Sequence, residues 1–414
     1  MNGCPLANLI DPDTYAQGMP YAELKRYRDV GPVVWHDDPR TGVPYWAIVG
    51  QKELDYVSKH PHLFSSAERA PFPAEYAQDM VENIHRKTII GMDPPLHQKV
   101  RRIMRAAFTP KSVDSYEPVF REHAKRIVDA VLPRGECEFV EEVAAELPLL
   151  AILELMGVDP ADRKDFFHWT NTMIFADDPD MSVSELDGQL ASLKVIEYAM
   201  RLAEEHKRHP KKNVLGALLD GRIDGRPLTE EEFGWMFVLT LVGGNESTRT
   251  VIAHGMRLLM EHPEQLQFLV ENPDRIENAC EEILRYNTAF IAMRRTAMQD
   301  IELAGQHIRK GDKILLHYHA VNHDERVFGE DAMAFDVRRD ERMPELYNEL
   351  RSFGIGQHFC IGSHLARLEL KVMFEEIIPR IRNPRLAAPV RYVRSFFVNG
   401  IKEMRVRFDA VPAA

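Results

Sequence analysis

The sequence predicts a mainly α-helical fold with small β-sheets, and three observations support this. Long stretches of the chain carry apolar residues at helical spacing, with proline and glycine in the gaps between them. Segments with strand character are short and few. No internal repeat, low-complexity tract or Ser/Gly-rich linker interrupts the 414 residues. We therefore expect residues 1–414 to form a single domain.

The predicted elements alternate unevenly along the chain. Helical periodicity covers residues 96–132, 140–157, 184–208, 229–260, 263–286 and 363–381. Strand character is confined to Tyr45–Val49, Ile301–Leu303, Lys313–Leu316 and Met404–Phe408. Gly305–Asp312, between two of these strands, predicts a hairpin or tight turn. Residues 65–90 and 166–195 are rich in Pro, Asp and Ser and are predicted to be irregular.

Charge and cysteine content exclude several classes of protein. With 64 acidic and 52 basic residues, the formal net charge is −12, which argues against a nucleic-acid partner. The four cysteines are widely spaced and form no CxxC pair, so we expect neither a disulfide framework nor a zinc site, and a cytoplasmic location. The first residues lack a secretory signal, and the longest apolar run, residues 235–244, is far shorter than a membrane span. We therefore expect no membrane anchor.

One cysteine lies in a glycine-rich turn directly before a predicted helix. Residues Phe353–Gly362 read Phe-Gly-Ile-Gly-Gln-His-Phe-Cys-Ile-Gly. A thiolate at Cys360 is favoured there by the positive end of the helix dipole and by unpaired backbone N–H groups. The glycines allow a flat group to approach the turn closely. A buried structural cysteine is the alternative, but the complete spacing over ten residues favours a metal ligand.

This turn is similar to the haem-thiolate loop of the cytochromes P450, in which the cysteine sulfur is the axial ligand of the iron. The resemblance extends over essentially the whole chain. It implies the cytochrome P450 fold, haem b (iron protoporphyrin IX) as cofactor and Cys360 as the metal ligand. Phe353, His358 and Gly362 of the same loop are expected to contact the haem. Because no anchor helix is expected, the chain resembles the bacterial members of the family.

The predicted helix 229–260 contains a weak stretch, Leu-Val-Gly-Gly-Asn-Glu-Ser-Thr at residues 241–248. Each glycine inside a helix costs about 1 kcal/mol relative to alanine, so the pair indicates either close helix packing or a functional groove. In the resembled family this stretch forms the dioxygen groove over the haem, and an acid followed by an alcohol relays protons there. Alignment with the glycines favours Ser247 as the alcohol, but Thr248 is adjacent, and the choice between the two hydroxyls stays open. The resemblance implies catalytic roles for Glu246, Ser247 and Thr248, and haem contacts for Gly243 and Gly244.

Haem carries two propionates, and buried carboxylates need cationic or hydrogen-bonding partners. His97 and Arg101 lie one turn apart on one face of a predicted helix. Arg295 precedes Thr-Ala, the usual ending of this segment in the family, and is preferred over Arg294 for that reason. Judged singly, each residue is better explained as a surface cation. Together with His358 and the cysteine loop, they predict a propionate-binding set.

Glu282 and Arg285 lie three residues apart on a predicted helix, where opposite charges pair. Such spacing occurs by chance in many helices. In the resembled family a similar pair is structural and clamps a second arginine, which corresponds here to Arg339 of Phe335–Arg339. We expect these three residues to support folding and haem retention.

Two apolar segments, Thr288–Met293 and Ser395–Val398, are candidates for the wall of a substrate pocket. They carry large aliphatic and aromatic side chains and no carboxylate, which favours an uncharged lipophilic ligand. The predicted contact residues are Phe290, Ile291, Met293, Phe396 and Phe397. In the family, regions such as 65–90 and 166–195 form the access lid.

The resemblance implies a monooxygenase that hydroxylates a lipophilic small molecule with O2. Electrons are expected from a ferredoxin-type partner and its NAD(P)H-dependent reductase. Arg294–Ala297 and Ile308–Lys313 are similar to bacterial members that hydroxylate terpenoids, sterol side chains or alkyl chains, so a terpenoid or steroid-like substrate is expected. Two alternatives remain. A haem-thiolate peroxygenase or oxidative-coupling enzyme is disfavoured by the acid–alcohol pair. A non-catalytic haem sensor or ligand-binding protein needs no proton relay.

Basic residues follow both haem-binding segments. If these segments flank one face of the haem, their positive charges form a patch that attracts an acidic ferredoxin. Otherwise they are scattered solvated charges. The residues are Arg102, Arg105, Lys111, Arg367 and Lys371.

Overall fold

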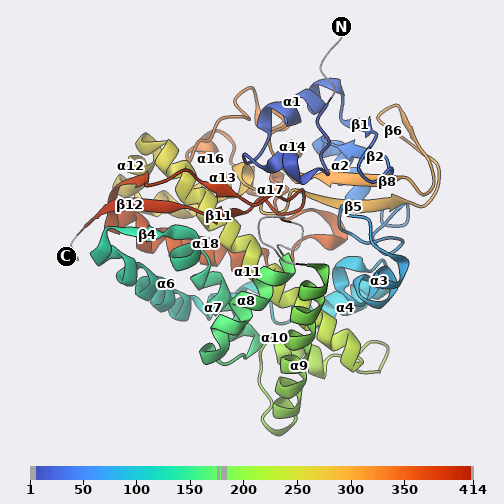
Figure 1. Ribbon diagram of the computed structural model, residues 1–414, viewed down its shortest axis with the longest axis horizontal. Coiled ribbons are helices and arrows are strands. Elements are labelled where there is room, and N and C mark those ends of the chain that lie inside the picture. Colours follow the sequence, from blue (N-terminus) through green and yellow to red (C-terminus); the bar gives the residue numbers. More distant parts are fainter. Residues whose placement is uncertain (1–5, 175–177, 179–183, 412–414) are drawn as a thin grey trace.

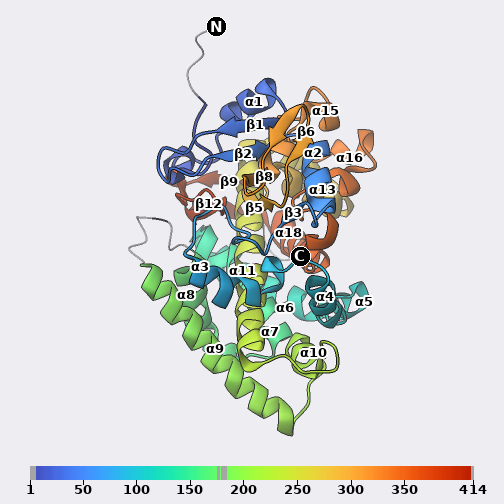
Figure 2. The same cartoon turned by 90° about the vertical axis from the view of Figure 1, so that its right-hand side faces the viewer.

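The computed structural model of the protein describes residues 6–174, 178 and 184–411. Helices dominate the architecture and the sheets lie toward one end, with the long helix α11 running through the middle of the molecule (Figures 1 and 2). This confirms the predicted mainly α fold with small β-sheets. None of the helices in the described ranges is long and apolar enough to cross a membrane.

The helices agree with the predicted periodic segments, several of which are divided. Residues 96–132 form three helices, with Pro110 at the start of the second, and residues 263–286 divide before Pro273, because proline breaks the helical hydrogen-bond ladder. The longer helices are α1 (Tyr21–Val30), α2 (Gln51–Lys59), α4 (Leu96–Arg105), α6 (Glu117–Val131), α7 (Glu146–Met156), α8 (Arg163–Ile174), α9 (Glu185–Arg208), α11 (Glu230–Glu261), α12 (Pro263–Glu271), α13 (Ile276–Tyr286) and α18 (Ser363–Ile377). The shorter ones are α3 (Gln78–Asn83), α5 (Pro110–Asp114), α10 (Val214–Asp220), α14 (Tyr318–Val321), α15 (Glu325–Phe328), α16 (Arg339–Arg342) and α17 (Leu346–Glu349).

One predicted irregular region is wrong in part. Residues 166–195 belong largely to α8 and α9, and α9 begins with a capping box in which Ser184 and Asp187 satisfy each other's backbone N–H groups. The part of this region at residues 175–177 and 179–183 lies outside the described residues. Residues 65–90 are mostly irregular, but they include α3 and the short 3₁₀ turn η2 (His85–Lys87).

The main sheet has the strand order β1-β2-β8-β5-β3, with β2 and β8 parallel and the other neighbours antiparallel. A second sheet has the order β4-β12-β9, and β6-β7 and β10-β11 form hairpin-like pairs. A hairpin forms here, but its second strand β7 lies within the predicted turn Gly305–Asp312 and pairs with β6, whereas residues 313–317 join the main sheet; Ala304 and Gly305 have positive φ in its turn. The strands are β1 (Val33–His36), β2 (Tyr45–Ile48), β3 (Phe64–Ser65), β4 (Glu136–Glu138), β5 (Ala292–Ala297), β6 (Ile301–Leu303), β7 (Gln306–Ile308), β8 (Lys313–His317), β9 (Ile381–Leu386), β10 (Arg391–Tyr392), β11 (Ile401–Glu403) and β12 (Arg405–Ala410).

Helix α11 is the centre of the core. It packs against α7, α8, α9, α13 and α18, and most of its side chains are buried. Close packing depends on its glycines: a Cβ at Gly244, for example, would lie 2.7 Å from Cδ1 of Ile152 on α7. A helix enclosed in this way holds its side chains in fixed positions, as a catalytic groove requires.

A fully buried ionic cluster joins α13 to the segment around α16. Arg285 donates through Nε and Nη2 to the two carboxylate oxygens of Glu282 at 2.7 and 2.8 Å. Arg339 Nε donates to Glu282 Oε2 at 3.0 Å. Further guanidinium N–H groups of both arginines donate to backbone carbonyls, including that of Ala334. Because all these partners are buried and satisfied, the cluster fixes the chain before the Cys360 loop.

Candidate active site

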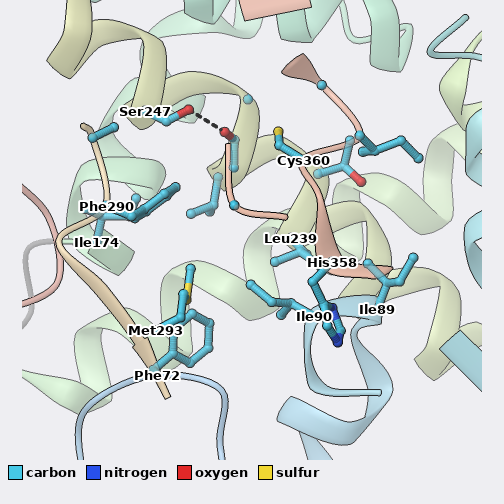
Figure 3. Close-up of a pocket in the computed structure, with 18 of the residues that line it drawn as sticks. Phe72, Ile89, Ile90, Ile174, Leu239, Ser247, Phe290, Met293, His358 and Cys360 are labelled. Atoms are coloured by element: carbon cyan, nitrogen blue, oxygen red, sulfur yellow. Dashed lines mark hydrogen bonds between the residues drawn. The ribbon is translucent and has the colours of Figure 1, made fainter. Parts of the chain in front are cut away.

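A cavity of about 740 Å³ lies between α11 and the Cys360 loop (Figure 3). Ser247 of α11 and Cys360 both line it, although they are far apart in sequence. Its lining is mainly apolar on the side of Phe72, Phe290 and Met293. On the side of the cysteine loop the lining includes the basic residues Arg101 and Arg295.

The Cys360 loop is a tight turn that only glycine allows. The amide of Cys360 donates to Phe353 O at 2.9 Å and closes the turn. Gly354 and Gly356 have φ of 67° and 74°, in the left-handed region. A Cβ at Gly356 would lie 2.6 Å from the carbonyl oxygen of Ser58. Beside Gly362 the nearest heavy atom to an added Cβ is Cys360 Sγ at 3.9 Å, so the surface over the sulfur is open to the cavity.

The surroundings of Cys360 act on its pKa in opposite directions. Burial raises the pKa of the thiol above its ordinary value. The backbone N–H of Gly362 and the guanidinium groups of Arg101 and Arg367 favour the thiolate. The exposed part of the side chain faces the cavity. A metal bound at the sulfur removes the remaining proton.

The predicted propionate-binding residues all line the cavity. His97 is buried, and neither of its ring nitrogens has a hydrogen-bond partner in the described structure. Its ring lies 4.4 Å from that of His358, which contacts Ser66 Oγ through Nε2 at 3.2 Å. Arg295 is 5% exposed, and its guanidinium donates to the carbonyl of Arg294. Arg101 Nη2 donates to the carbonyl of Phe359, within the cysteine loop, at 2.6 Å.

These residues fit a haem. Unpaired imidazole nitrogens and two arginines beside an apolar cavity need anionic or acceptor partners, which two propionates provide. The open surface over Gly362 accommodates a flat macrocycle, and Cys360 Sγ offers one axial ligand. The donor set on this chain therefore matches the chemistry of iron protoporphyrin IX.

The weak stretch of α11 faces the cavity. Ser247 Oγ donates to the carbonyl of Gly243 at 2.9 Å, one turn earlier, as the dashed line in Figure 3 shows. Such a bond from a serine side chain to the carbonyl four residues earlier slightly weakens a helix. Nothing lies within 4 Å of a Cβ added at Gly243, so Gly243 faces open space, whereas Gly244 also packs against α7. Thr248 is buried and lines the same cavity.

Glu246 does not line the cavity. It is fully buried, and its Oε2 lies 2.7 Å from Arg249 Nη2. Arg249 also donates to Asn171 of α8, so this pair lies on the side of α11 that faces α8. Burial raises the pKa of Glu246, and Arg249 acts in the opposite direction. The carboxyl group is thus next to Ser247 in sequence but separated from the cavity.

Three of the five predicted wall residues line the cavity: Phe290, Met293 and Phe397. Ile291 and Phe396 were wrongly predicted to do so, because both are buried in the core around Tyr45 and Leu315 instead. Successive side chains of an extended chain point to opposite faces, so each of these residues turns away where its neighbour turns inward.

Several lining residues were missed from the sequence. Phe72, whose ring centroid lies 5.1 Å from that of Phe397, comes from the region predicted to be irregular, as do Ile89 and Ile90. Glu75 lines the cavity and fixes this region, because its Oε1 accepts from Arg294 Nη1 at 2.9 Å and from Lys313 Nζ at 2.8 Å. These contacts join distant segments, and local patterns do not reveal them.

Glu369 of α18 was also missed. It is buried in the cavity wall, and neither of its carboxylate oxygens has a hydrogen-bond partner among the described residues. Burial raises its pKa well above the ordinary value, which favours the protonated form of the group.

Fold and site together define a haem-thiolate protein, and comparisons with known proteins agree. Residues 183–382 match the sequence profile of the family described as Cytochrome P450. A steroid C26-monooxygenase of Rhodococcus jostii (strain RHA1) is 35% identical over 409 residues, covering 97% of this chain and 84% of that protein. A linalool 8-monooxygenase of Pseudomonas putida is 34% identical, covering 96% and 98%.

A solved structure of similar fold is a Mycobacterium marinum cytochrome P450 in complex with pseudoionone. It has a TM-score of 0.89 and 30% identity, and covers 99% of this chain and 100% of that one. The chain belongs to the cytochrome P450 family. It is a monooxygenase with haem as its cofactor.

Proposed function

We propose that this enzyme hydroxylates an uncharged lipophilic molecule of the steroid or terpenoid type at an unactivated carbon. The observation that carries the proposal is the cavity of about 740 Å³, whose lining includes many apolar and aromatic side chains, among them Phe72, Phe290 and Phe397. The relatives named for steroids and linalool act on ligands of this chemistry. A charged substrate would lose its hydration there without a partner.

A spectroscopic ligand screen tests the substrate class. Steroids and terpenoids should shift the Soret band of the purified haem enzyme toward the high-spin form, and small aromatic acids should not. The opposite pattern would overturn the proposed class.

Different residues of the chain bind the cofactor, orient the substrate and exclude water. When bound, the haem activates O2 and transfers one oxygen atom to a C–H bond of the substrate. Cys360 would hold the cofactor through its thiolate, and His97, Arg101, Arg295 and His358 would neutralise or hydrogen-bond its propionates. The apolar wall orients the substrate and excludes water.

We assign proton delivery to Ser247 and Glu246. The Ser247 hydroxyl donates to Gly243 O in this structure, and serine lacks the methyl group that restricts χ1 in threonine. Its O–H group can therefore rotate toward the cavity. Glu246 is suited to hold a proton because burial raises its pKa. Glu246 is paired with Arg249 on the side of α11 that faces α8. Its carboxyl group must therefore rotate toward Ser247 before it can transfer a proton to the Ser247 hydroxyl.

Replacing Ser247 by alanine should separate substrate binding from productive turnover. We expect Ser247→Ala to bind substrate normally. The amount of product formed per NAD(P)H should fall about ten-fold or more, because proton delivery no longer keeps pace with electron delivery and reduced oxygen is released as peroxide or water. Product and hydrogen peroxide are measured against NAD(P)H consumed. Ser247→Thr, which keeps the hydroxyl, should remain coupled. If Thr248→Ala uncouples the enzyme and Ser247→Ala does not, the relay hydroxyl is Thr248.

We further propose that electrons come from an acidic ferredoxin, which is reduced by an NAD(P)H-dependent reductase. We infer a cytoplasmic location for the enzyme because these partners and NAD(P)H are found there. Arg102 and Arg105 of α4 and Lys111 of α5 are exposed, and no ion pair involving them is found within the described residues. Arg101 of α4 bonds the Cys360 loop, so these cations lie beside the haem-binding loop.

The predicted patch is smaller than the sequence suggests. Arg367 binds Glu281 at 2.6 Å and stacks on Tyr347, and Lys371 lies 3.0 Å from Glu277. Their charges are already paired within the protein. The proposed docking surface therefore consists of Arg102, Arg105 and Lys111.

Reversing two of these charges should slow electron transfer without changing the site. We expect Arg102→Glu combined with Arg105→Glu to lower the rate of reduction by an acidic ferredoxin about ten-fold, because steering charges raise association rates. The wild-type rate should fall as salt rises and the variant rate should depend less on salt. Stopped-flow reduction measures both. Lys310→Glu, at an exposed cation in the turn after β7, is the control and should behave as wild type.

A further inference from the structure

A polar atom without a partner lies in the apolar wall of the cavity. His85 is 8% exposed and lines the cavity, and its Nε2 has no hydrogen-bond partner in the described parts of the chain. Two other polar side chains that line the cavity have partners. Thr240 Oγ1 donates to Met236 O at 2.7 Å, and Ser192 Oγ donates to Gly188 O at 2.9 Å.

The imidazole of His85 is held in place by its neighbours. Its ring meets those of Phe72 and Tyr76 edge-on, with centroids 5.4 and 4.5 Å away. Its backbone carbonyl accepts from Thr88 Oγ1 at 2.7 Å, and the close packing behind it requires glycine at position 91, where a Cβ would meet that carbonyl oxygen. A ring fixed in this way is pre-organised to bind a ligand group.

His85 is uncharged at neutral pH. Burial lowers its pKa to about 4, so one ring nitrogen donates a hydrogen bond and the other accepts one. A neutral imidazole suits an uncharged oxygen, such as a hydroxyl or a ketone, because it supplies no charge to balance a carboxylate. Such an oxygen would satisfy a buried atom that otherwise has no partner.

His85 also lies away from the dioxygen groove. The turn η2 packs against α11, and the neighbouring amide of Ile89 contacts Met236 Sδ at 3.2 Å. Met236 precedes Ser247 by about three helical turns, roughly 16 Å along the helix axis. Ile89, four residues after His85, therefore lies beside the first half of α11, and a ligand that contacts both His85 and the groove extends along this helix.

We propose that His85 is the polar anchor of the substrate and binds a hydroxyl or ketone oxygen at the end farthest from the carbon that is oxidised. This inference rests on the proposed function and narrows it to long lipophilic molecules with a terminal oxygen. A steroid with an oxygen at C3 and a side chain directed to the haem has this form.

The test compares ligands that differ by that oxygen. Dissociation constants from Soret titration of the haem enzyme are measured for cholesterol against 5α-cholestane, and for 1-hexadecanol against hexadecane. We expect wild type to bind the oxygenated member of at least one pair about ten-fold more tightly. His85→Leu should bring that ratio close to one. His85→Gln, whose amide can occupy the position of Nε2, should restore part of it.

A control separates recognition from folding. Phe72→Leu, which changes the apolar wall beside His85, should weaken both members of a pair equally and leave their ratio unchanged. Equal binding of both members by wild type, or a ratio that survives in His85→Leu, overturns the role of His85 and leaves the proposed function standing. If none of the four ligands shifts the Soret band, and steroids and terpenoids fail in the wider screen, the proposed function fails with it.

Discussion

Cys360→His is expected to abolish turnover and to remove the red-shifted Soret band of the reduced carbon monoxide complex. The sulfur of Cys360 lines the cavity beside Gly362, where the surface of the loop is open. A thiolate at this position is the electron-rich ligand that favours O–O cleavage. Histidine can still bind iron, so the variant should retain haem but lose the spectral signature of thiolate ligation. Absorbance spectra of the reduced enzyme with carbon monoxide measure this directly.

Cys137→Ala is the matched control for Cys360→His. Cys137 is also a buried cysteine without a disulfide partner, but it lies in β4 and does not line the cavity. Burial raises its pKa to about 12, so its thiol is protonated and inert. Its replacement should leave the spectrum unchanged. An unaltered spectrum in Cys360→His, or the loss of the signature in Cys137→Ala, would contradict the assignment of the axial ligand.

Local motifs of the sequence predicted the two halves of the reactive centre. The spacing of glycines around Cys360 and the weak stretch of α11 each lie within ten residues, so their meaning does not depend on distant parts of the chain. The positive φ of Gly354 and Gly356 and the bond from Ser247 to Gly243 are the physical reasons for those patterns. Periodicity likewise located the long helices, because the apolar residues of a buried helix face recur at every third or fourth position in the sequence.

The wall of the cavity was predicted less well because contacts between distant segments build it. Phe72 and His85 come from a region without periodicity, and their positions depend on Phe397 and on Glu75 binding two buried cations. Strand β5 was missed because Arg294 and Arg295 interrupt its apolar pattern, although both arginines are buried. Arg294 binds Glu75, which is far from it in sequence, so the local pattern gave no sign that this charge is buried.

The orientation of Glu246 shows the same limit at a single residue. Its place beside Ser247 predicted a carboxyl group in the groove. In the structure, Arg249 and the polar residues of α8 hold it on the other side of the helix. A helix turns about 100° per residue, so neighbours in sequence face different surroundings. Tertiary packing decides on which side of the helix a side chain such as Glu246 finds its partner.

Replacing Glu282 by glutamine is expected to destabilise the fold by about 3–5 kcal/mol, because it leaves two buried guanidinium groups without their carboxylate. Arg285 and Arg339 both bind Glu282, and all three side chains are buried. A loss of this size is a large share of the stability of a typical protein. The midpoint of urea unfolding of the haem enzyme, followed by circular dichroism, measures it.

The chain offers an exposed counterpart with the same spacing. Arg338 and Glu341 form an i, i+3 pair at 3.0 Å, but their side chains are 55% and 44% exposed. Glu341→Gln should therefore leave the midpoint of urea unfolding close to that of wild type, because water solvates both groups when the pair is lost. If the two substitutions cost the same, the ionic cluster around Glu282 does not hold the segment before the cysteine loop. If only Glu282→Gln is costly and it also loses haem more readily, burial is what makes this pair structural.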